Sequence, residues 1–94
     1  MTLEQIIEQN YQVTRNRGLI TDHTNARDFV NKIREEVAEV EAEPDLSEAQ
    51  FQEVADVILT CLNYFNHFGV NAKAMLEIII SKNKNRVKWA TINF

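Results

Sequence analysis

Residues 35–56 read EEVAEVEAEPDLSEAQFQEVAD, and this stretch decides the expected fold. It holds nine carboxylates and no Lys or Arg. Glu36 and Glu39 form one pair with a spacing of three, and Glu53 and Asp56 form a second. Residues three apart share one face of a helix, and the PDLS segment between the pairs reads as a turn. A hairpin of two helices would therefore bring the two pairs together.

The two pairs indicate a binding site for a divalent cation. Carboxylates that converge on a partly buried surface repel one another and lose hydration, so they require a positive partner. Mg²⁺ prefers oxygen ligands and keeps several waters that a substrate can replace. We therefore expect a Mg²⁺ site with four ligands: Glu36, Glu39, Glu53 and Asp56.

The flanking sequence predicts four helices, at roughly residues 2–17, 24–43, 47–68 and 71–89. Thr2 and Ser47 each precede a Gln by three residues, which is the pattern of a capping box. Gly18 and Gly69 supply C-terminal stops, and Pro44 ends the second helix. With two Gly and one Pro, the chain has little turn material for a β-sandwich or barrel. The expected fold class is all-α.

The composition is that of one globular domain, residues 1–94. A formal charge of −4 without a dominant basic stripe disfavours a nucleic-acid partner. The single Cys forms no internal disulfide, and the start of the sequence lacks the features of a signal peptide. Polar side chains interrupt the most apolar stretch, residues 51–68, so no membrane partner is expected and the expected location is the cytoplasm.

The third and fourth helices carry more apolar surface than a helix packed on one side needs. In residues 51–68, apolar side chains occupy the main stripe and both flanks. Three consecutive isoleucines, residues 78–80, extend the apolar surface of the fourth helix in the same way. We expect copies of the chain to associate through these two helices, as a homodimer or homotetramer.

A narrow polar strip interrupts the apolar third helix: Glu53, Asp56, Thr60 and Asn63. Such a strip is either a solvent-facing edge or the wall of a site, and its start in the second carboxylate pair favours the wall. Lys32 lies one turn before Glu36 and is expected either to pair with it or to reach a substrate. The first helix is interpreted mainly as an outer scaffold, and neither His23 nor His67 is assigned a role.

Charge is segregated along the chain. Residues 73–88 contain five Lys or Arg and one acid, in contrast with the acidic stretch at 35–56. Lys82 and Arg86 are four apart and share a helical face. They can complement the dipole at a helix C-terminus, pair with the acidic stretch, or bind the phosphates of a ligand whose other end is held by the metal.

Together these motifs resemble one protein family. KIREEVAEV at residues 32–40, EVADVIL at residues 53–59 and the later Lys82 and Arg86 are similar to the MazG-like nucleoside triphosphate pyrophosphohydrolases, part of an all-α pyrophosphatase superfamily. The resemblance covers roughly residues 29–86. It implies a bundle of four or five helices that dimerises or forms tetramers, with Mg²⁺, or Mn²⁺ as a substitute, held by the two carboxylate pairs.

The resemblance also implies an activity, which is hydrolysis of a nucleoside triphosphate between the α- and β-phosphates to a monophosphate and pyrophosphate. The catalytic base would be Glu36 or Glu39. The implied phosphate-binding residues are Lys82, Asn85 and Arg86. Three further side chains are secondary candidates for the site: Lys32, Glu35 and Asn63.

Two alternatives stay open at this point. A phosphoribosyl-ATP pyrophosphohydrolase-like enzyme belongs to the same superfamily and has a suitable chain length. A non-enzymatic module whose acidic hairpin binds a basic partner would use the same charge without chemistry. The phase of the acids separates these classes, because metal ligation requires them to converge, whereas a docking patch requires only net charge.

Overall fold

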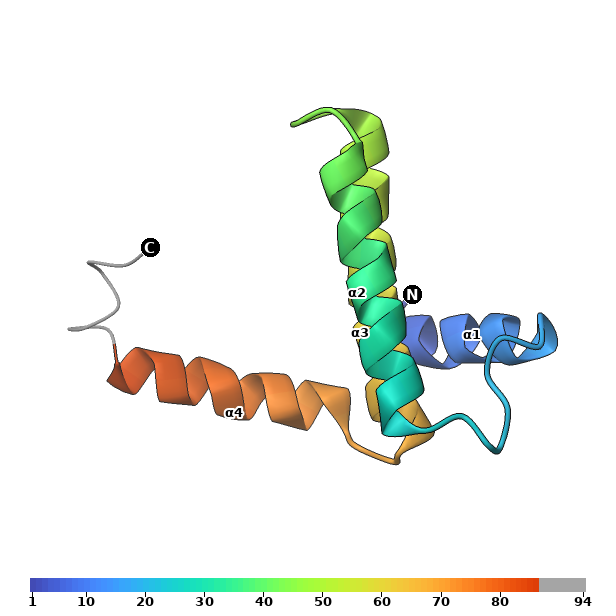
Figure 1. The fold of residues 1–94 in the computed structure, drawn as a ribbon. Helices are drawn as coiled ribbons and strands as arrows, with labels where there is room; N and C mark the ends of the chain where they lie inside the picture. The colour runs from blue at the N-terminus through green and yellow to red at the C-terminus, as the bar shows by residue number, and fades with distance from the viewer. Residues whose placement is uncertain (87–94) are drawn as a thin grey trace.

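The computed structural model describes residues 1–86, which fold into four helices and contain no β-strand (Figure 1). The helices are α1 (Leu3–Asn16), α2 (Ala26–Ala42), α3 (Glu48–His67) and α4 (Ala72–Asn85). The all-α prediction is confirmed for this part of the chain. The helical segment expected at residues 87–89 lies outside the described residues. No helix within residues 1–86 combines the length and the apolar character needed to cross a membrane.

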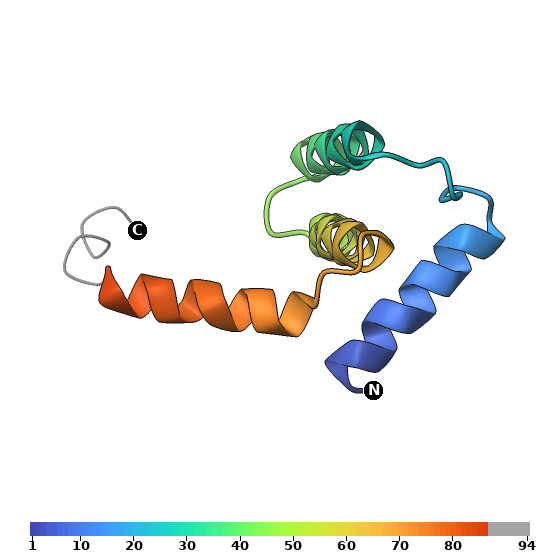
Figure 2. The same ribbon diagram turned by 90° about the horizontal axis from the view of Figure 1, so that it is seen from below.

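An antiparallel hairpin of α2 and α3 forms the centre of the fold, and the other two helices leave it on different sides (Figures 1 and 2). The hairpin helices pack against each other more extensively than any other pair. α1 packs against α3 and runs across the hairpin, and residues 17–25 connect it to α2. α4 starts at the end of α3 and extends away from α1 (Figure 1).

Side-chain caps set the starts of the helices. The Thr2 hydroxyl accepts a hydrogen bond from the Gln5 amide (3.1 Å), and the Gln5 side chain accepts one from the Thr2 amide (2.8 Å), as the capping-box pattern predicts. At α3, the Ser47 hydroxyl accepts from the Gln50 amide (3.0 Å), but the Gln50 side-chain oxygen accepts from the Leu46 amide (2.9 Å). The second predicted capping box is thus only half formed, and Gln50 instead fastens the turn between α2 and α3.

The core is small and centres on Phe29, which is 4% exposed. Its ring stacks on that of Tyr64 with centroids 5.1 Å apart, and it also contacts the rings of His67 (5.3 Å) and Phe68 (6.0 Å). This aromatic cluster ties the first turn of α2 to the last turns of α3. Glu36 lies two turns further along the same face of α2, so the packing of Phe29 fixes how deeply Glu36 is held.

The described residues leave much apolar surface uncovered. Ala72 is 3% exposed, but every later residue of α4 is exposed. The hairpin helices add further apolar side chains on their outer faces. The large exposed apolar residues of α2, α3 and α4 include Val37, Phe51, Val54, Ile58, Met75, Leu76, Ile78, Ile79 and Ile80. Apolar exposure on this scale is typical of a surface that another molecule covers.

Candidate metal centre

Three carboxylates from the two hairpin helices converge at one point. Glu36 lies midway along α2, and Glu53 and Asp56 lie about one turn apart on α3. Each offers one oxygen, and the three oxygens all lie within 4.8 Å of one another. The two predicted pairs therefore meet across the hairpin through three of their four members. We call these three residues the acid cluster.

Burial distinguishes the acid cluster from an ordinary patch of surface acids. Glu36 is 8% exposed, whereas Asp56 faces water, so the cluster runs from inside the hairpin to its surface. The Oε2 atoms of Glu36 and Glu53 are buried and have no hydrogen-bond partner among the described residues. Buried carboxylate oxygens without a partner are strongly disfavoured unless a cation or a proton binds them. A hard divalent ion such as Mg²⁺ or Mn²⁺ fits this set of donors.

Among residues 1–86, Lys32 is the cation that forms an ion pair with the acid cluster. Its Nζ atom lies 3.3 Å from Oε1 of Glu36 and 3.5 Å from Oε2 of Glu35. The predicted pairing of Lys32 with Glu36 is therefore present in the structure. The pair leaves the second oxygen of Glu36 unbound, so one ammonium group does not complete the site.

Burial and, to a smaller extent, nearby charges shift the pKa of Glu36. Burial raises the pKa of Glu36 above its usual value, and the negative charge of Glu39 acts in the same direction. The hydrogen bond with Lys32 lowers this pKa but does not reverse the shift. Burial lowers the pKa of Lys32, but its pairing with Glu36 and Glu35 outweighs this and leaves the pKa raised. The positive charge near Glu36 is thus too small to offset the effect of burial on its pKa.

In metal-free protein, Glu36→Gln is expected to stabilise the fold by an amount that grows with pH. Because the pKa of Glu36 is raised in the folded state, that state holds the proton more tightly than the unfolded state. Wild-type stability therefore falls as the pH rises through the two pKa values. Urea unfolding with EDTA from about pH 4 to about pH 8 should show the smallest difference between variant and wild type at the acid end. A difference that does not change with pH would contradict this account of Glu36.

The acid cluster lies in the wall of a cleft of about 640 Å³, which is enclosed by α1, α2, α3 and the loop before α2. The whole polar strip predicted on α3 lines this cleft: Glu53, Asp56, Thr60 and Asn63. The strip is therefore the wall of a cleft rather than a plain solvent-facing edge. α2 contributes a second set of lining residues, which includes Lys32, Glu35, Glu36 and Glu39.

α1 forms part of the cleft and is more than an outer scaffold. Asn10, Thr14 and Arg17 follow a spacing of four and three, and all three line the cleft. Asn63, which is 5% exposed, accepts a hydrogen bond from Asn10 (3.0 Å) and donates one to the Thr14 hydroxyl (3.2 Å). This face of α1 was not predicted, although its spacing carries the same kind of signal as the strip on α3.

His67 has a structural role that the sequence pattern did not indicate. Its Nε2–H donates to the Thr24 carbonyl (3.0 Å), and its Nδ1 atom accepts from the Tyr11 hydroxyl (2.7 Å). The ring therefore ties α1 and the loop before α2 to the end of α3. Thr24, Leu19 and Ile20 line the cleft, so this contact positions one of its walls. Assigning no role to His67 was wrong.

Glu39 and Glu35 lie near the acid cluster without belonging to it. Both line the cleft, but the group of converging oxygens contains neither. Glu35 pairs with Lys32, and the charge of Glu39 acts on Glu36. Of the four predicted metal ligands, the structure thus gathers three and places Glu39 beside them.

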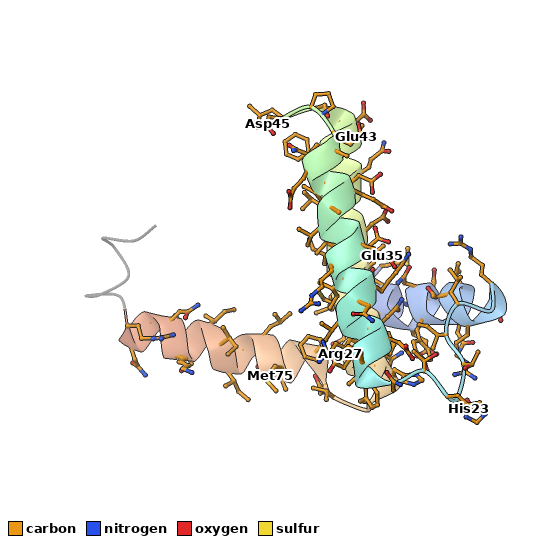
Figure 3. All side chains as sticks on the ribbon, viewed as in Figure 1. His23, Arg27, Glu35, Glu43, Asp45 and Met75 are labelled. Atoms are coloured by element: carbon orange, nitrogen blue, oxygen red, sulfur yellow. The ribbon has the colours of Figure 1, made fainter. Side chains whose placement is uncertain are left out.

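The predicted phosphate-binding residues lie elsewhere. Lys82 and Asn85 belong to the last turn of α4 and Arg86 caps it, and all three are exposed and do not line the cleft. In Figure 3, Glu35 lies on the side of the hairpin that faces α1, whereas Met75 marks α4 on the other side. Within one chain, the basic end of α4 does not meet the acid cluster.

Comparison of the chain with protein-family models, curated protein sequences and solved structures found no match. The site is therefore interpreted from its chemistry. The cleft joins the acid cluster to two cations, Arg17 and Lys32, and to the neutral amides of Asn10 and Asn63. These groups suit a ligand that links anionic groups to a polar, uncharged part.

Proposed function

We propose that this protein is a Mg²⁺-dependent nucleoside triphosphate pyrophosphohydrolase of the MazG-like type. The reaction is hydrolysis between the α- and β-phosphates, which gives a nucleoside monophosphate and pyrophosphate in the cytoplasm. One observation carries the proposal: Glu36, Glu53 and Asp56 converge, and two of their buried oxygens have no hydrogen-bond partner within residues 1–86. A patch that only attracted a basic partner would have no need of buried, converging acids.

The size and lining of the cleft support a nucleotide as the substrate. A volume of about 640 Å³ falls within the range of small-molecule sites, about 300–1,000 Å³. Arg17 and Lys32 line the same cleft as the acid cluster, so phosphates bound to the metal can also pair with cations. The amides of Asn10 and Asn63 offer hydrogen-bonding groups to the sugar or the base.

The residues of the site have distinct proposed roles. Glu36, Glu53 and Asp56 hold Mg²⁺, which when bound polarises the phosphate oxygens and neutralises part of their charge. Glu39 lines the cleft outside the acid cluster, so its carboxylate is free to act as the base that takes a proton from the attacking water. Between the two bases implied by the sequence, we therefore favour Glu39 over Glu36.

We further infer that copies of the chain associate through α3 and α4, as a homodimer or homotetramer. The isoleucines at residues 78–80 are 42–58% exposed in the single chain. Covering them with a second copy removes apolar surface from water, which is the main favourable contribution to stable association. Association could also place the basic end of α4 from one copy beside the acid cluster of the other copy. Lys82, Asn85 and Arg86 would bind phosphate only through this contact between copies.

Ile79→Asp is expected to convert the wild-type oligomer into a monomer, because an unpaired charge is strongly disfavoured inside an apolar interface. Light scattering during size-exclusion chromatography measures the mass. Val13→Asp on α1 is the matched control, since Val13 is 54% exposed and lies outside α3 and α4. This control should keep the wild-type mass. A wild-type protein that is monomeric at micromolar concentration would contradict the proposed association.

A panel of ribo- and deoxyribonucleoside triphosphates, incubated with Mg²⁺ and assayed for pyrophosphate, tests the proposed activity. We expect pyrophosphate release from at least one of them, and its loss when EDTA removes the metal. Phosphoribosyl-ATP belongs in the panel, because its selective use would favour the alternative enzyme of the same superfamily. If no substrate is cleaved and no Mg²⁺ binds, the acidic hairpin is better explained as a docking surface for a basic partner.

A further inference from the structure

We propose that the Lys32 ammonium group is an exchangeable counter-ion of the acid cluster. It pairs with Glu36 before a divalent ion binds, and it turns to the anionic groups of the ligand once the ion has replaced it. This inference rests on the proposed function for the nature of the ion and the ligand. It gives Lys32 a role in coupling two binding events.

Position and distance single out Lys32. It lies one turn before Glu36 on α2, and residues four apart project from the same face of a helix. Its ammonium nitrogen is 3.3 Å from Glu36 and 3.5 Å from Glu35. Within residues 1–86, no other Lys or Arg forms an ion pair with a member of the acid cluster. Lys32 is therefore the group that an incoming ion has to replace.

The pairing is incomplete, which makes Lys32 replaceable. The ammonium group contacts Oε1 of Glu36, whereas the buried Oε2 atoms of Glu36 and Glu53 have no hydrogen-bond partner in the described part of the chain. Oxygens from three carboxylates lie within 4.8 Å of one another, and one ammonium group cannot neutralise them. A divalent ion among these oxygens is the stronger partner, and its charge repels the ammonium group.

Burial determines which partner moves. The side chain of Glu36 is 10% exposed, whereas that of Lys32 is 48% exposed. The carboxylate is thus held in place, while the ammonium group turns freely on its flexible stem. An ion pair with one partner this exposed can be broken, because the ammonium group is hydrated as it leaves the carboxylate. Lys32 also lines the cleft and stays beside a bound ligand after it leaves Glu36.

The exchange links the binding of the ion to the binding of a polyphosphate. Without polyphosphate, the ion has to displace Lys32, and this weakens its binding. With polyphosphate, the released ammonium group gains a new anionic partner. Each ligand therefore strengthens the binding of the other by the same factor.

Lys32→Met tests the first half of the exchange. Metal-free Lys32→Met is expected to bind Mn²⁺ about tenfold more tightly than wild type in calorimetric titrations, since no ammonium group competes for Glu36. Arg34→Met removes the same charge from the same helix, and Arg34 forms no ion pair among the described residues. Its affinity for Mn²⁺ should stay within about twofold of wild type at physiological salt. Lys32→Gln should shift the affinity in the same direction as Lys32→Met, and circular dichroism checks that each variant is folded.

Titration of the Mg²⁺-loaded protein with the Mg²⁺ complex of inorganic tripolyphosphate tests the second half. Here Lys32→Met is expected to bind about tenfold more weakly than wild type, because the phosphates lose a cation. Opposite changes in one variant are the signature of exchange, whereas a merely structural Lys32 would weaken both kinds of binding. If Lys32→Met does not bind Mn²⁺ more tightly, the counter-ion role is overturned, while wild-type Mn²⁺ binding still supports the proposed function. If the wild type binds no Mn²⁺, both are overturned.

Discussion

Replacing Glu53 with Gln is expected to abolish Mg²⁺-dependent pyrophosphate release and to weaken Mg²⁺ binding by about 100-fold or more. The substitution keeps the size of the side chain but removes the charge that a hard metal ion requires. It acts on a buried oxygen that has no other partner among the described residues. Helical circular dichroism should be unchanged, because Glu53 contributes no helix cap. Calorimetric titration with Mg²⁺ and a pyrophosphate assay measure the two effects.

Two companion variants make this result specific. Glu41→Gln removes an acid from the same acidic stretch, but Glu41 is exposed and does not line the cleft, so both measurements should match wild type. Glu39→Gln should lose turnover while largely keeping Mg²⁺ binding, as expected of a base beside the cluster. An equal loss of both would make Glu39 a ligand. Full turnover by Glu53→Gln would remove the acid cluster from the proposed site.

Phe29→Ala is expected to lower the free energy of unfolding by about 3–5 kcal/mol. Phe29 is 4% exposed and contacts three aromatic rings at the C-terminal end of α3, so the truncation leaves a cavity in the middle of a small core. The total free energy of unfolding of a native domain is only about 5–15 kcal/mol, so the expected loss is a large share of it. Thermal unfolding followed by circular dichroism should show a Tm lowered by more than about 12 °C.

Phe29→Leu provides the graded control, with an expected loss of about 1 kcal/mol because most of the volume is kept. Phe29 and Glu36 share a face of α2, so Phe29→Ala should also weaken Mg²⁺ binding. Saturating Mg²⁺ should in turn restore part of the lost stability, because the ion binds the folded state. A loss below about 1 kcal/mol for Phe29→Ala would mean that the aromatic cluster is not the core.

The features that were predicted correctly depend on local chemistry. The capping box of Thr2 forms within four residues, and Gly18 and Gly69 adopt the positive φ angles, 75° and 70°, that end helices. The acid cluster also depends on residues that are close together in the sequence. A spacing of three residues on each helix, with a short turn between them, brings Glu36 opposite Glu53, and these constraints lie within about twenty residues.

Contacts between distant segments were not predictable in the same way. His67 bonds to Tyr11 and Thr24, which lie 56 and 43 residues away, and no local pattern encodes such partners. Glu39 is only about 60° from Glu36 around the axis of α2. Whether it joins the cluster depends on how α2 and α3 approach each other. The direction of α4 is likewise not encoded in its own sequence pattern.

α4 projects from the hairpin (Figure 2), and the described part of its own chain leaves the apolar side chains of this helix exposed. If a second copy provides the cover, the covering of this helix depends on protein concentration, and dilution alone exposes its apolar surface. The amount of protein made by the cell then determines whether the copies assemble. Below a threshold concentration the chain is a monomer with α4 uncovered, and above it the oligomer forms, so the expression level of the protein would regulate its assembly.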